Sequence, residues 1–406
     1  MNERELLSAF HAHVAPTSLT PMGMSVSSAR GSTIRDSHGN EHMDLLAGIG
    51  VAALGHGNRA VLAAVEEQLH RYLHVMVYGE FVLEKQVALA QRLTSLLPDP
   101  LDSVYFTNSG TEAVEGALKL TRRATRRSRV LSFDGAFHGD TLGSVSVGGN
   151  PIYREPFQPL LPEVGFLGFN DHDCLDAIDD SVAAVIVEPV QAEAGVIIPQ
   201  PGFLGELRRR CTEAGALLIF DEVITGFGRT GSLFALERID GEAVVPDVLV
   251  LAKALGGGLP LGAFVASKKL LKTFAVDPPL GHVTTFGGHP LSCAAGLASL
   301  AEIERMELPA RADRVGALFE EKLAQRLPEP FRVEIRRAGL LVGIEMESPE
   351  RVERFTAECR AEGLILGWTL HDDKVVRIAP PLIITEAEID EAAFRMQRAA
   401  LRVLGD

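Results

Sequence analysis

One lysine stands apart because of its neighbours. Lys253 follows the apolar run 249–252 and precedes the glycine-rich segment 256–258. An amine at the end of a buried strand is partly desolvated, which lowers its pKa and makes it nucleophilic. Such a lysine can form a Schiff base with a carbonyl compound, and the glycines allow the backbone to approach a ligand. The alternative is a lysine that extends its ammonium group from the strand end into water.

A second candidate site lies at the start of an expected helix. The apolar run 104–106 is followed by the polar segment 107–112 and then by a helical pattern from Ala113 onward. Free N–H groups at a helix start, together with hydroxyl groups and a glycine, can hold a phosphate. The alternative is a simple helix cap made by Ser109 or Thr111.

Three more strand ends carry side chains that could do chemistry. Phe137 follows the run 130–133 between two glycines, so it could stack on a planar ring or pack under its own loop. Glu188 and Asp221 each follow an apolar run directly, where a carboxylate is unfavourable without a partner. Asp221 is therefore expected to hold a protonated ring nitrogen, to cap a helix or to form a buried salt bridge.

Four of these features together fit one cofactor. A phosphate cradle, a stacking aromatic ring, a carboxylate for a ring nitrogen and a nucleophilic lysine are what pyridoxal phosphate needs from a protein. Ligands of open parallel sheets bind at the carboxyl ends of the strands, where all four features lie. The combination predicts a pyridoxal phosphate site.

The elements that must position these residues have the pattern of an α/β protein. Apolar strands alternate with amphipathic helices between about 55 and 290, which predicts a mostly parallel central sheet. The expected strands are 104–106, 130–133, 183–187, 217–220, 248–251 and 263–266. We expect a large domain over 51–305 and a smaller α+β domain over 306–406, joined by the N-terminal segment 1–50.

The second half of the pattern supports the smaller domain. Its expected elements are strands at 332–335, 340–345 and 375–378, and helices at 350–361 and 386–403. Thr385 and Glu388 have the spacing of a capping box, which predicts the start of the last helix. In the N-terminal segment, 36–40 has the composition of a turn within a hairpin.

Composition excludes several classes of function. The net charge of -15 argues against nucleic acid and anionic membranes as partners. The four cysteines form no CxxC pair, which is typical of reduced thiols in a cytoplasmic protein. The twelve histidines show no metal-binding spacing, so no metal site is expected. The chain begins without a basic and then apolar leader, and its most apolar span is broken by Lys253 and glycines, so we expect neither a signal peptide nor a membrane helix.

The motifs resemble those of the class III (omega) aminotransferases. The likeness rests on the segments 107–112, 221–231 and 253–258 in their order and spacing, and it extends from about residue 20 to the C-terminus. It implies a fold-type I enzyme that depends on pyridoxal phosphate.

The resemblance also implies roles for individual residues. Lys253 would bind the cofactor covalently and move a proton, and Asp221 would pair with the pyridine nitrogen. The other cofactor contacts would be Ser109, Gly110 and Thr111 at the phosphate, Phe137 and Val223 at the two faces of the ring, and His138 and Glu188 nearby. Thr285 is similar to a threonine that reaches the phosphate of a partner subunit, which implies a homodimer with shared active sites, or a tetramer of such dimers.

Substrate binding is implied at three further residues. Arg377 lies on an apolar strand and needs an anion, either in a structural salt bridge or in a substrate carboxylate. It is similar to the arginine that binds the α-carboxylate in ornithine- and acetylornithine-type members. Glu193 is similar to the glutamate that covers this arginine in ornithine- and 4-aminobutyrate-type members. Tyr78 is expected either at the substrate entrance or in the core. The implied reaction transfers an amino group from ornithine, acetylornithine, 4-aminobutyrate or a diamine to a 2-oxo acid, with 2-oxoglutarate favoured.

The sequence differs at two positions from the pattern of the ornithine and acetylornithine types, so other substrates remain open. Ile224 stands where ornithine and acetylornithine types usually have glutamine, and Asp140 where the acetylornithine type usually has arginine. A broad amine:pyruvate transaminase is therefore the alternative. A further alternative is a different enzyme on the same fold, namely an aminomutase, an epimerase or a decarboxylating relative. A non-enzymatic regulator is disfavoured by the complete catalytic set, and a nucleotide-binding Rossmann enzyme by the lack of a GxGxxG motif after the first strand.

Overall fold

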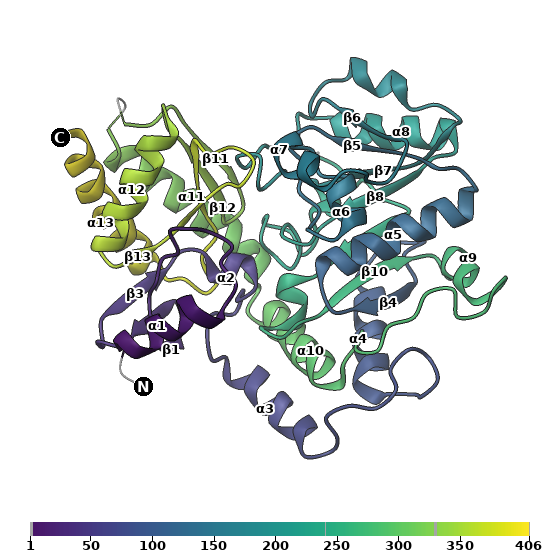
Figure 1. Cartoon of the computed structure of the whole chain (residues 1–406), viewed down its shortest axis with the longest axis horizontal. Coiled ribbons are helices and arrows are strands. Elements are labelled where there is room, and N and C mark those ends of the chain that lie inside the picture. The colour runs from purple at the N-terminus through teal and green to yellow at the C-terminus, as the bar shows by residue number, and fades with distance from the viewer. Residues whose placement is uncertain (1–2, 240, 329–330, 406) are drawn as a thin grey trace.

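The chain folds into two lobes that meet along the side of a central sheet (Figure 1). The computed structural model describes residues 3–239, 241–328 and 331–405. The larger lobe contains most of the chain between α3 (Arg59–Leu69) and α10 (Pro290–Arg305), and the smaller lobe combines the two ends of the chain. Within the described residues, no helix is long and apolar enough to cross a membrane.

The large lobe is built on a seven-stranded sheet in the order β4-β10-β9-β8-β7-β5-β6. The strands from β9 to β6 run parallel, and β10 runs antiparallel to both of its neighbours. This confirms the predicted mostly parallel sheet. The strands are β4 (Ser103–Thr107), β5 (Arg129–Phe133), β6 (Val164–Leu167), β7 (Val182–Val187), β8 (Leu217–Asp221), β9 (Val248–Leu251) and β10 (Gly262–Ala266). All were predicted except β6, which contains a glycine and lies at the sheet edge.

Both faces of this sheet are covered, because successive side chains of a strand point to opposite sides. On one face, Ile186 and Ile219 pack in one core with α5 (Gly110–Thr125). On the other, Val185 and Leu218 pack in a second core with α8 (Phe203–Ala214). The two-sided burial explains why the strands are nearly continuous apolar runs, and it leaves only the strand ends for polar side chains.

The remaining helices of this lobe surround the sheet. They are α4 (Glu84–Ser95), α6 (Leu142–Ser146), α7 (Pro151–Arg154) and α9 (Lys268–Leu271), together with α3 and α10. The short α2 (Ala47–Gly50) precedes them and lies where the lobes meet.

The small lobe contains two four-stranded sheets, in the orders β1-β2-β3-β13 and β11-β12-β15-β14. Its strands are β1 (Val26–Arg30), β2 (Thr33–Asp36), β3 (Glu41–Asp44), β11 (Glu334–Ala338), β12 (Leu341–Glu345), β13 (Leu364–Ile365), β14 (Gly367–Trp368) and β15 (Val375–Ile378). Its helices are α11 (Leu308–Arg326), α12 (Pro349–Ala361) and α13 (Glu386–Gly405). The predicted capping box is present, since Thr385 Oγ1 accepts the N–H of Glu388 at 3.2 Å and its own N–H donates to Oε2 of Glu388 at 2.7 Å.

One strand pairing joins the two ends of the chain. β13 runs parallel to β3, with Leu364 opposite Met43 and Ile365 opposite Asp44. This pairing supports the division into 51–305 and a small domain made of 1–50 and 306–406, which we propose as the domain boundaries.

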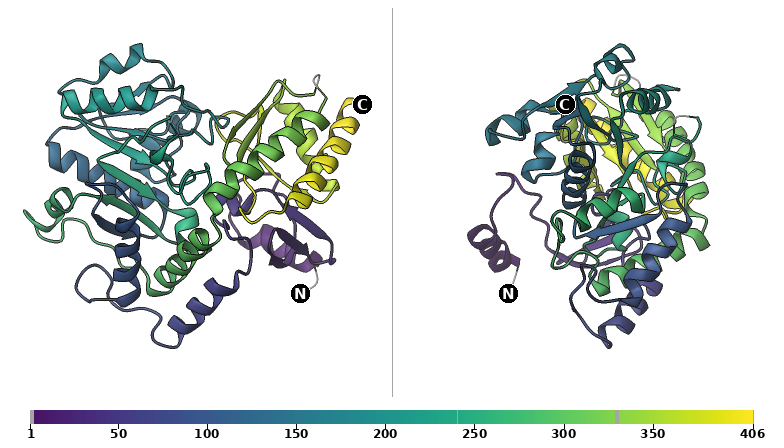
Figure 2. Two further views of the ribbon diagram at one scale, coloured as in Figure 1. Left: turned by 180° about the vertical axis from the view of Figure 1, so that it is seen from behind. Right: turned by 90° about the vertical axis from the view of Figure 1, so that its right-hand side faces the viewer.

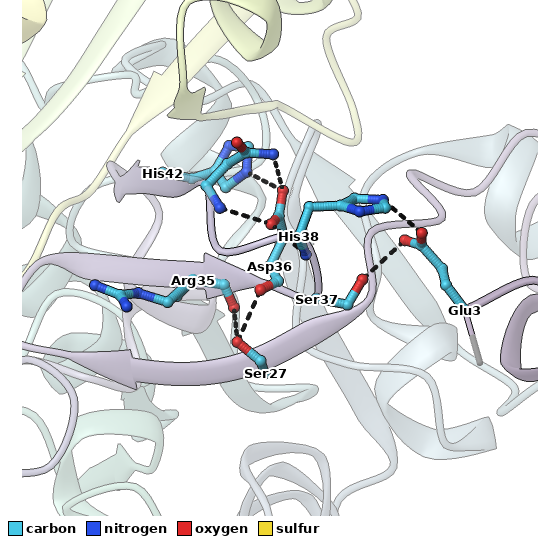
Figure 3. Close-up of polar contacts among 8 residues, drawn as sticks. Glu3, Ser27, Arg35, Asp36, Ser37, His38 and His42 are labelled. Carbon is cyan, nitrogen blue, oxygen red and sulfur yellow. Dashed lines mark hydrogen bonds and ion pairs between the residues drawn. The ribbon is translucent and has the colours of Figure 1, made fainter. Parts of the chain in front are cut away.

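The N-terminal helix α1 (Glu3–His13) stands off from the rest of the fold in the right-hand view of Figure 2, and none of its residues is buried. Figure 3 shows how Glu3 is held by the turn between β2 and β3, where it accepts the Ser37 hydroxyl at 3.0 Å and pairs with His38 at 2.5 Å. Asp36 organises this predicted turn by accepting the N–H groups of His38 and Asn40, each at 2.9 Å. Hydrogen bonds from His42 and then Asn40 hold the pKa of Asp36 well below its ordinary value.

Candidate active site

A cavity of about 420 Å³ lies at the carboxyl ends of the parallel strands and brings the predicted residues together. It is lined by Ser109, Gly110, Thr111, Phe137, His138, Glu188, Glu193, Asp221, Val223, Ile224 and Lys253, among others. These residues come from five separate segments, which lie at the ends of β4, β5, β7, β8 and β9. The sheet therefore gathers groups that are far apart in the sequence.

Lys253 is placed in the cavity by an abrupt end to β9. The strand ends at Leu251, and Lys253 itself has a left-handed backbone with a φ of 48°. Such a conformation is unfavourable for a side chain with a Cβ and is common at functional sites. The side chain is half-buried, and burial is the main cause that lowers the pKa of Lys253 below its ordinary value. A lowered pKa increases the share of the neutral amine, which is the nucleophilic form.

Asp221 and His138 form a buried pair beside this lysine. Oδ2 of Asp221 lies 2.7 Å from Nδ1 of His138, and Oδ1 accepts the N–H of Val223 at 3.0 Å. Asp221 is the last residue of β8, one residue beyond the predicted strand end, and a buried salt bridge was one of its expected roles, but the sequence did not identify His138 as the partner. Among the described residues, Nε2 of His138 has no hydrogen-bond partner although it is buried.

The start of α5 has the geometry of an anion cradle. Ser109 caps the helix by accepting the N–H of Glu112 at 3.3 Å, while the N–H groups of the first helical residues, Gly110 and Thr111, have no acceptor within the helix. Thr111 is held by Ser144, whose hydroxyl lies 2.9 Å from Oγ1. The sequence left open whether this segment forms a helix cap or an anion site. The helix start has the Ser109 cap and also free N–H groups that can bind an anion.

Glu188 ties two loops of the cavity together. Its carboxylate accepts the N–H of Phe137 at 2.9 Å and that of Ala192 at 3.2 Å. Burial raises the pKa of Glu188 to about 7. Phe137 is thus fixed by a backbone hydrogen bond in a loop that lines the cavity, while Val223 lines it from the loop after β8.

Arg377 and Glu193 come from different lobes and meet at the cavity. Arg377 lies on β15 of the small lobe, and its Nη1 is paired with Oε1 of Glu193. Both side chains are buried, and Glu193 lines the cavity whereas Arg377 does not, so the carboxylate covers the guanidinium. Nε of Arg377 has no hydrogen-bond partner among the described residues, which leaves a donor for another anion.

The arginine of the long motif after Asp221 has a positioning role. Arg229 is buried, and its Nη1 donates to the carbonyl oxygens of Leu340 at 3.0 Å and Pro380 at 2.7 Å. Burial lowers the pKa of Arg229 to about 9. Because both acceptors belong to the small lobe, Arg229 attaches the loop that follows Asp221 to the lobe that carries Arg377.

Two predicted residues lie elsewhere in the single chain. Tyr78 lines a separate cavity of about 250 Å³ together with Thr284, and Thr285 is exposed. Conversely, the sequence analysis missed Val51, Asn108 and 258–261 in the lining of the main cavity. Asn108 and Gly258 lie within motifs that were recognised and 259–261 follow one directly, whereas Val51 comes from a distant segment without a local signal.

The described residues fit pyridoxal phosphate. The cradle at Gly110 and Thr111 suits its phosphate, and the amine of Lys253 is a group that can form an imine with its aldehyde. Gly139 lies so close to the cradle that an added Cβ would sit 2.5 Å from Cβ of Thr111, and the backbone there has a φ of 113°. No group of three His, Cys, Asp or Glu residues that could hold a metal ion is present in the described part of the chain.

Comparison with known proteins agrees with this chemistry. The family model for class-III aminotransferases matches residues 14–400. The chain is 42% identical to an acetylornithine aminotransferase of Methanopyrus kandleri over 409 residues, covering 100% of both chains. It is 39% identical to one of Methanosarcina mazei over 376 residues, covering 92% of this chain and 91% of the relative.

Solved structures give the same result. An ornithine aminotransferase from Toxoplasma gondii, described with partial occupancy of PLP at its active site, has a TM-score of 0.91 at 30% identity, over 100% of this chain and 95% of the other. An (S)-enantioselective omega-transaminase from Thermomicrobium roseum also has a TM-score of 0.91, at 29% identity, over 100% and 99% of the two chains. The predicted fold type and the predicted cofactor are thereby confirmed. The chain belongs to the class-III aminotransferases, and it is a transaminase that uses pyridoxal phosphate.

Proposed function

We propose that the chain transfers the terminal amino group of an ornithine-type donor, such as acetylornithine or ornithine, to 2-oxoglutarate. The observation that carries this proposal is the Glu193–Arg377 pair, which places a covered guanidinium at the cavity that contains Lys253. An uncovered Arg377 would bind the carboxylate of a 2-oxo acid through a forked, charge-assisted contact. The printed names of the relatives, acetylornithine aminotransferase and ornithine aminotransferase, support the same class of donor.

The residues of the chain divide the work of this reaction. Pyridoxal phosphate, when bound, supplies the electron sink that stabilises negative charge on the substrate carbon. Lys253 would hold the cofactor, and its neutral Nζ would take the proton from the substrate carbon that carries the amine. Asp221 would pair with the ring nitrogen of the cofactor, and the N–H groups at the start of α5 would hold its phosphate.

Glu193 would give one cavity two specificities. While it covers Arg377, a donor can present its terminal amine to Lys253 without its carboxylate being drawn to the guanidinium. When Glu193 moves away, Arg377 and its free Nε can accept the carboxylate of the 2-oxo acid. The two half-reactions then use the same lysine and the same cofactor in turn.

A broad amine:pyruvate transaminase is the second candidate. Ile224 lines the cavity as an apolar residue, which would suit an uncharged amine better than a polar donor does. The similar omega-transaminase from Thermomicrobium roseum supports this candidate. A preference for pyruvate over 2-oxoglutarate as acceptor would favour it.

We further propose a homodimer with shared active sites, in which Thr285 contacts the cofactor phosphate of the partner subunit. Thr285 is exposed, and so are the neighbouring apolar side chains of Val283 and Phe286. Exposed apolar side chains that cluster in this way are typical of interfaces. Mixing the Lys253→Ala and Thr285→Ala chains should restore one intact site per mixed dimer, whereas a monomer would show no restoration. The four free cysteines support a reducing, cytoplasmic location.

The proposed function is tested with half-reactions of the protein loaded with pyridoxal phosphate. Acetylornithine, ornithine, 4-aminobutyrate, putrescine and simple arylalkylamines are each mixed with the loaded protein, and the cofactor absorbance is followed. Acetylornithine or ornithine should react fastest, and 2-oxoglutarate should reverse the change. Borohydride should fix the cofactor on Lys253, as peptide mass analysis would show. Reaction with arylalkylamines alone would overturn the proposed donor class.

A further inference from the structure

A short loop of the small lobe forms several hydrogen bonds with residues of the large lobe. The loop 369–374 connects β14 to β15, and we name it the strap. It is a compact turn, because the N–H of Thr369 donates to the Val375 carbonyl at 3.0 Å and the Thr369 hydroxyl donates to the carbonyl of Asp372. The strap projects from the small lobe toward α7 of the large lobe (Figure 1).

The strap holds Glu193 at two points. The N–H of Leu370 donates to Oε2 of Glu193 at 2.9 Å, and the N–H of His371 donates to the backbone carbonyl of Glu193 at 2.9 Å. The other carboxylate oxygen, Oε1, pairs with Arg377. Each oxygen of the carboxylate that covers Arg377 therefore has its own partner, and one of the two partners is the strap.

The ring of His371 attaches the strap to the large lobe. Its Nδ1 lies 2.9 Å from the carbonyl oxygen of Gly135, which can only accept, so Nδ1 carries the proton. The ring stacks on Tyr153, with centroids 5.2 Å apart and an interplanar angle of 21°, and meets the edge of Phe137 at 5.7 Å. The Tyr153 hydroxyl donates to the carbonyl oxygen of Leu370 at 3.0 Å.

These contacts have a consequence for Glu193. The carboxylate can leave Arg377 only if its hydrogen bond from Leu370 breaks as well, or if the strap moves with it. Because His371 and Tyr153 anchor the strap on the large lobe, they favour the position in which Arg377 is covered. Burial lowers the pKa of His371, which keeps the ring in the neutral form that donates from Nδ1 alone.

We propose that His371 is a positioning residue that sets, through the strap and Glu193, how readily Arg377 becomes available to a substrate carboxylate. The strap would thereby determine the balance between carboxylate-bearing substrates and substrates without a carboxylate. This inference rests on the proposed function, because it assigns Arg377 the carboxylate of the 2-oxo acid.

The test compares two carbonyl substrates on one form of the enzyme. The protein is loaded with pyridoxamine phosphate and mixed in single turnovers with 2-oxoglutarate, which needs Arg377, or with butanal, which has no carboxylate. The measured quantity is the ratio of the two second-order rate constants. In His371→Ala this ratio should rise about three- to tenfold in favour of 2-oxoglutarate, the value of one lost hydrogen bond.

Three further variants separate positioning from a general loss of structure. His371→Asn can still donate to Gly135, so its ratio should return toward that of the wild type. Tyr153→Phe keeps the stacking ring but loses the hydroxyl bond to the strap, and it should shift the ratio in the same direction as His371→Ala by a smaller factor. Lys374→Ala changes an exposed side chain of the same strap and should leave the ratio unchanged.

The outcomes distinguish this inference from the proposed function. An unchanged ratio in His371→Ala and Tyr153→Phe, or equal changes for both substrates, would overturn the role of the strap. A wild-type protein that fails to react with 2-oxoglutarate at all would overturn the proposed function instead.

Discussion

Asp221 and His138 share a hydrogen bond of 2.7 Å in the wall of the cavity that also contains Lys253. Both side chains are buried, and the second oxygen of Asp221 is taken by the N–H of Val223. The carboxylate is therefore fixed in position by two contacts from the protein. These two contacts compensate for the burial of the carboxylate and fix its orientation at the site.

We expect Asp221→Asn to slow proton transfer in the half-reaction by about 10²- to 10³-fold, the typical effect of removing one preorganised electrostatic partner. Asn keeps the size of the side chain but removes its charge. Single-turnover absorbance with the best donor measures the rate, and cofactor content per chain serves as the control, because binding through the phosphate and Lys253 should persist. A rate within about threefold of the wild type would contradict the role of the charge.

Arg377→Gln should reduce the second-order rate constant for 2-oxoglutarate by about 10- to 100-fold, because a charge-assisted hydrogen bond is lost. The rate with a plain amine such as putrescine should change far less. The single variant leaves Glu193 buried without its cation, so the double variant Arg377→Gln, Glu193→Gln is the matched control. Equal losses for both substrates in the double variant would show that Arg377 is structural.

Gly139→Ala should weaken cofactor binding by about tenfold or more. The new Cβ would lie 2.5 Å from Cβ of Thr111, and the φ of 113° is unfavourable for alanine. Titration of the protein with pyridoxal phosphate, followed by absorbance, measures the dissociation constant. Gly405→Ala is the control, because an added Cβ there meets no heavy atom within 4 Å. Unchanged affinity in Gly139→Ala would show that the close contact between Gly139 and Thr111 is not needed for cofactor binding.

Glu222 should make the protein less stable as pH rises toward neutrality. Its carboxylate accepts the N–H groups of Ala235 at 2.6 Å and Leu236 at 2.8 Å, and burial raises its pKa from 4.5 to about 7. The folded state therefore binds a proton that the unfolded state has released, and the stabilisation present below pH 4.5 is lost as pH rises through 7. The full loss is about 3 kcal/mol, from about 1.4 kcal/mol per pKa unit.

Urea unfolding at pH 5 and pH 7 measures this effect as a difference between wild type and Glu222→Gln. Glutamine cannot titrate, so the variant should lose less stability between the two pH values than the wild type, whatever its absolute stability. Parallel pH dependence in the two proteins would contradict the raised pKa of Glu222.

Most strands of the large sheet could be predicted from the sequence, because the pattern that identifies a buried strand spans only a few consecutive residues. The buried strands β7, β8 and β9 are continuous apolar runs that require a covered sheet on both faces, and a polar residue can follow only where the strand ends. That constraint placed Asp221 and Lys253 at one edge of the sheet. By contrast, β6 was missed, because its four residues include Gly165 and give no such run.

The sequence by itself determined the approximate strand ends and the chemical types of the groups that meet there, and it placed the helix start at Ala113, three residues after the observed start at Gly110. Only the tertiary structure decided which partner each group has: His138 for Asp221, the strap for Glu193, and Val51 rather than Tyr78 in the cavity wall. The reason is physical. Periodicity and capping depend on a few neighbouring residues, whereas the contact between Glu193 and Arg377 joins residues 184 positions apart and exists only once two lobes pack together.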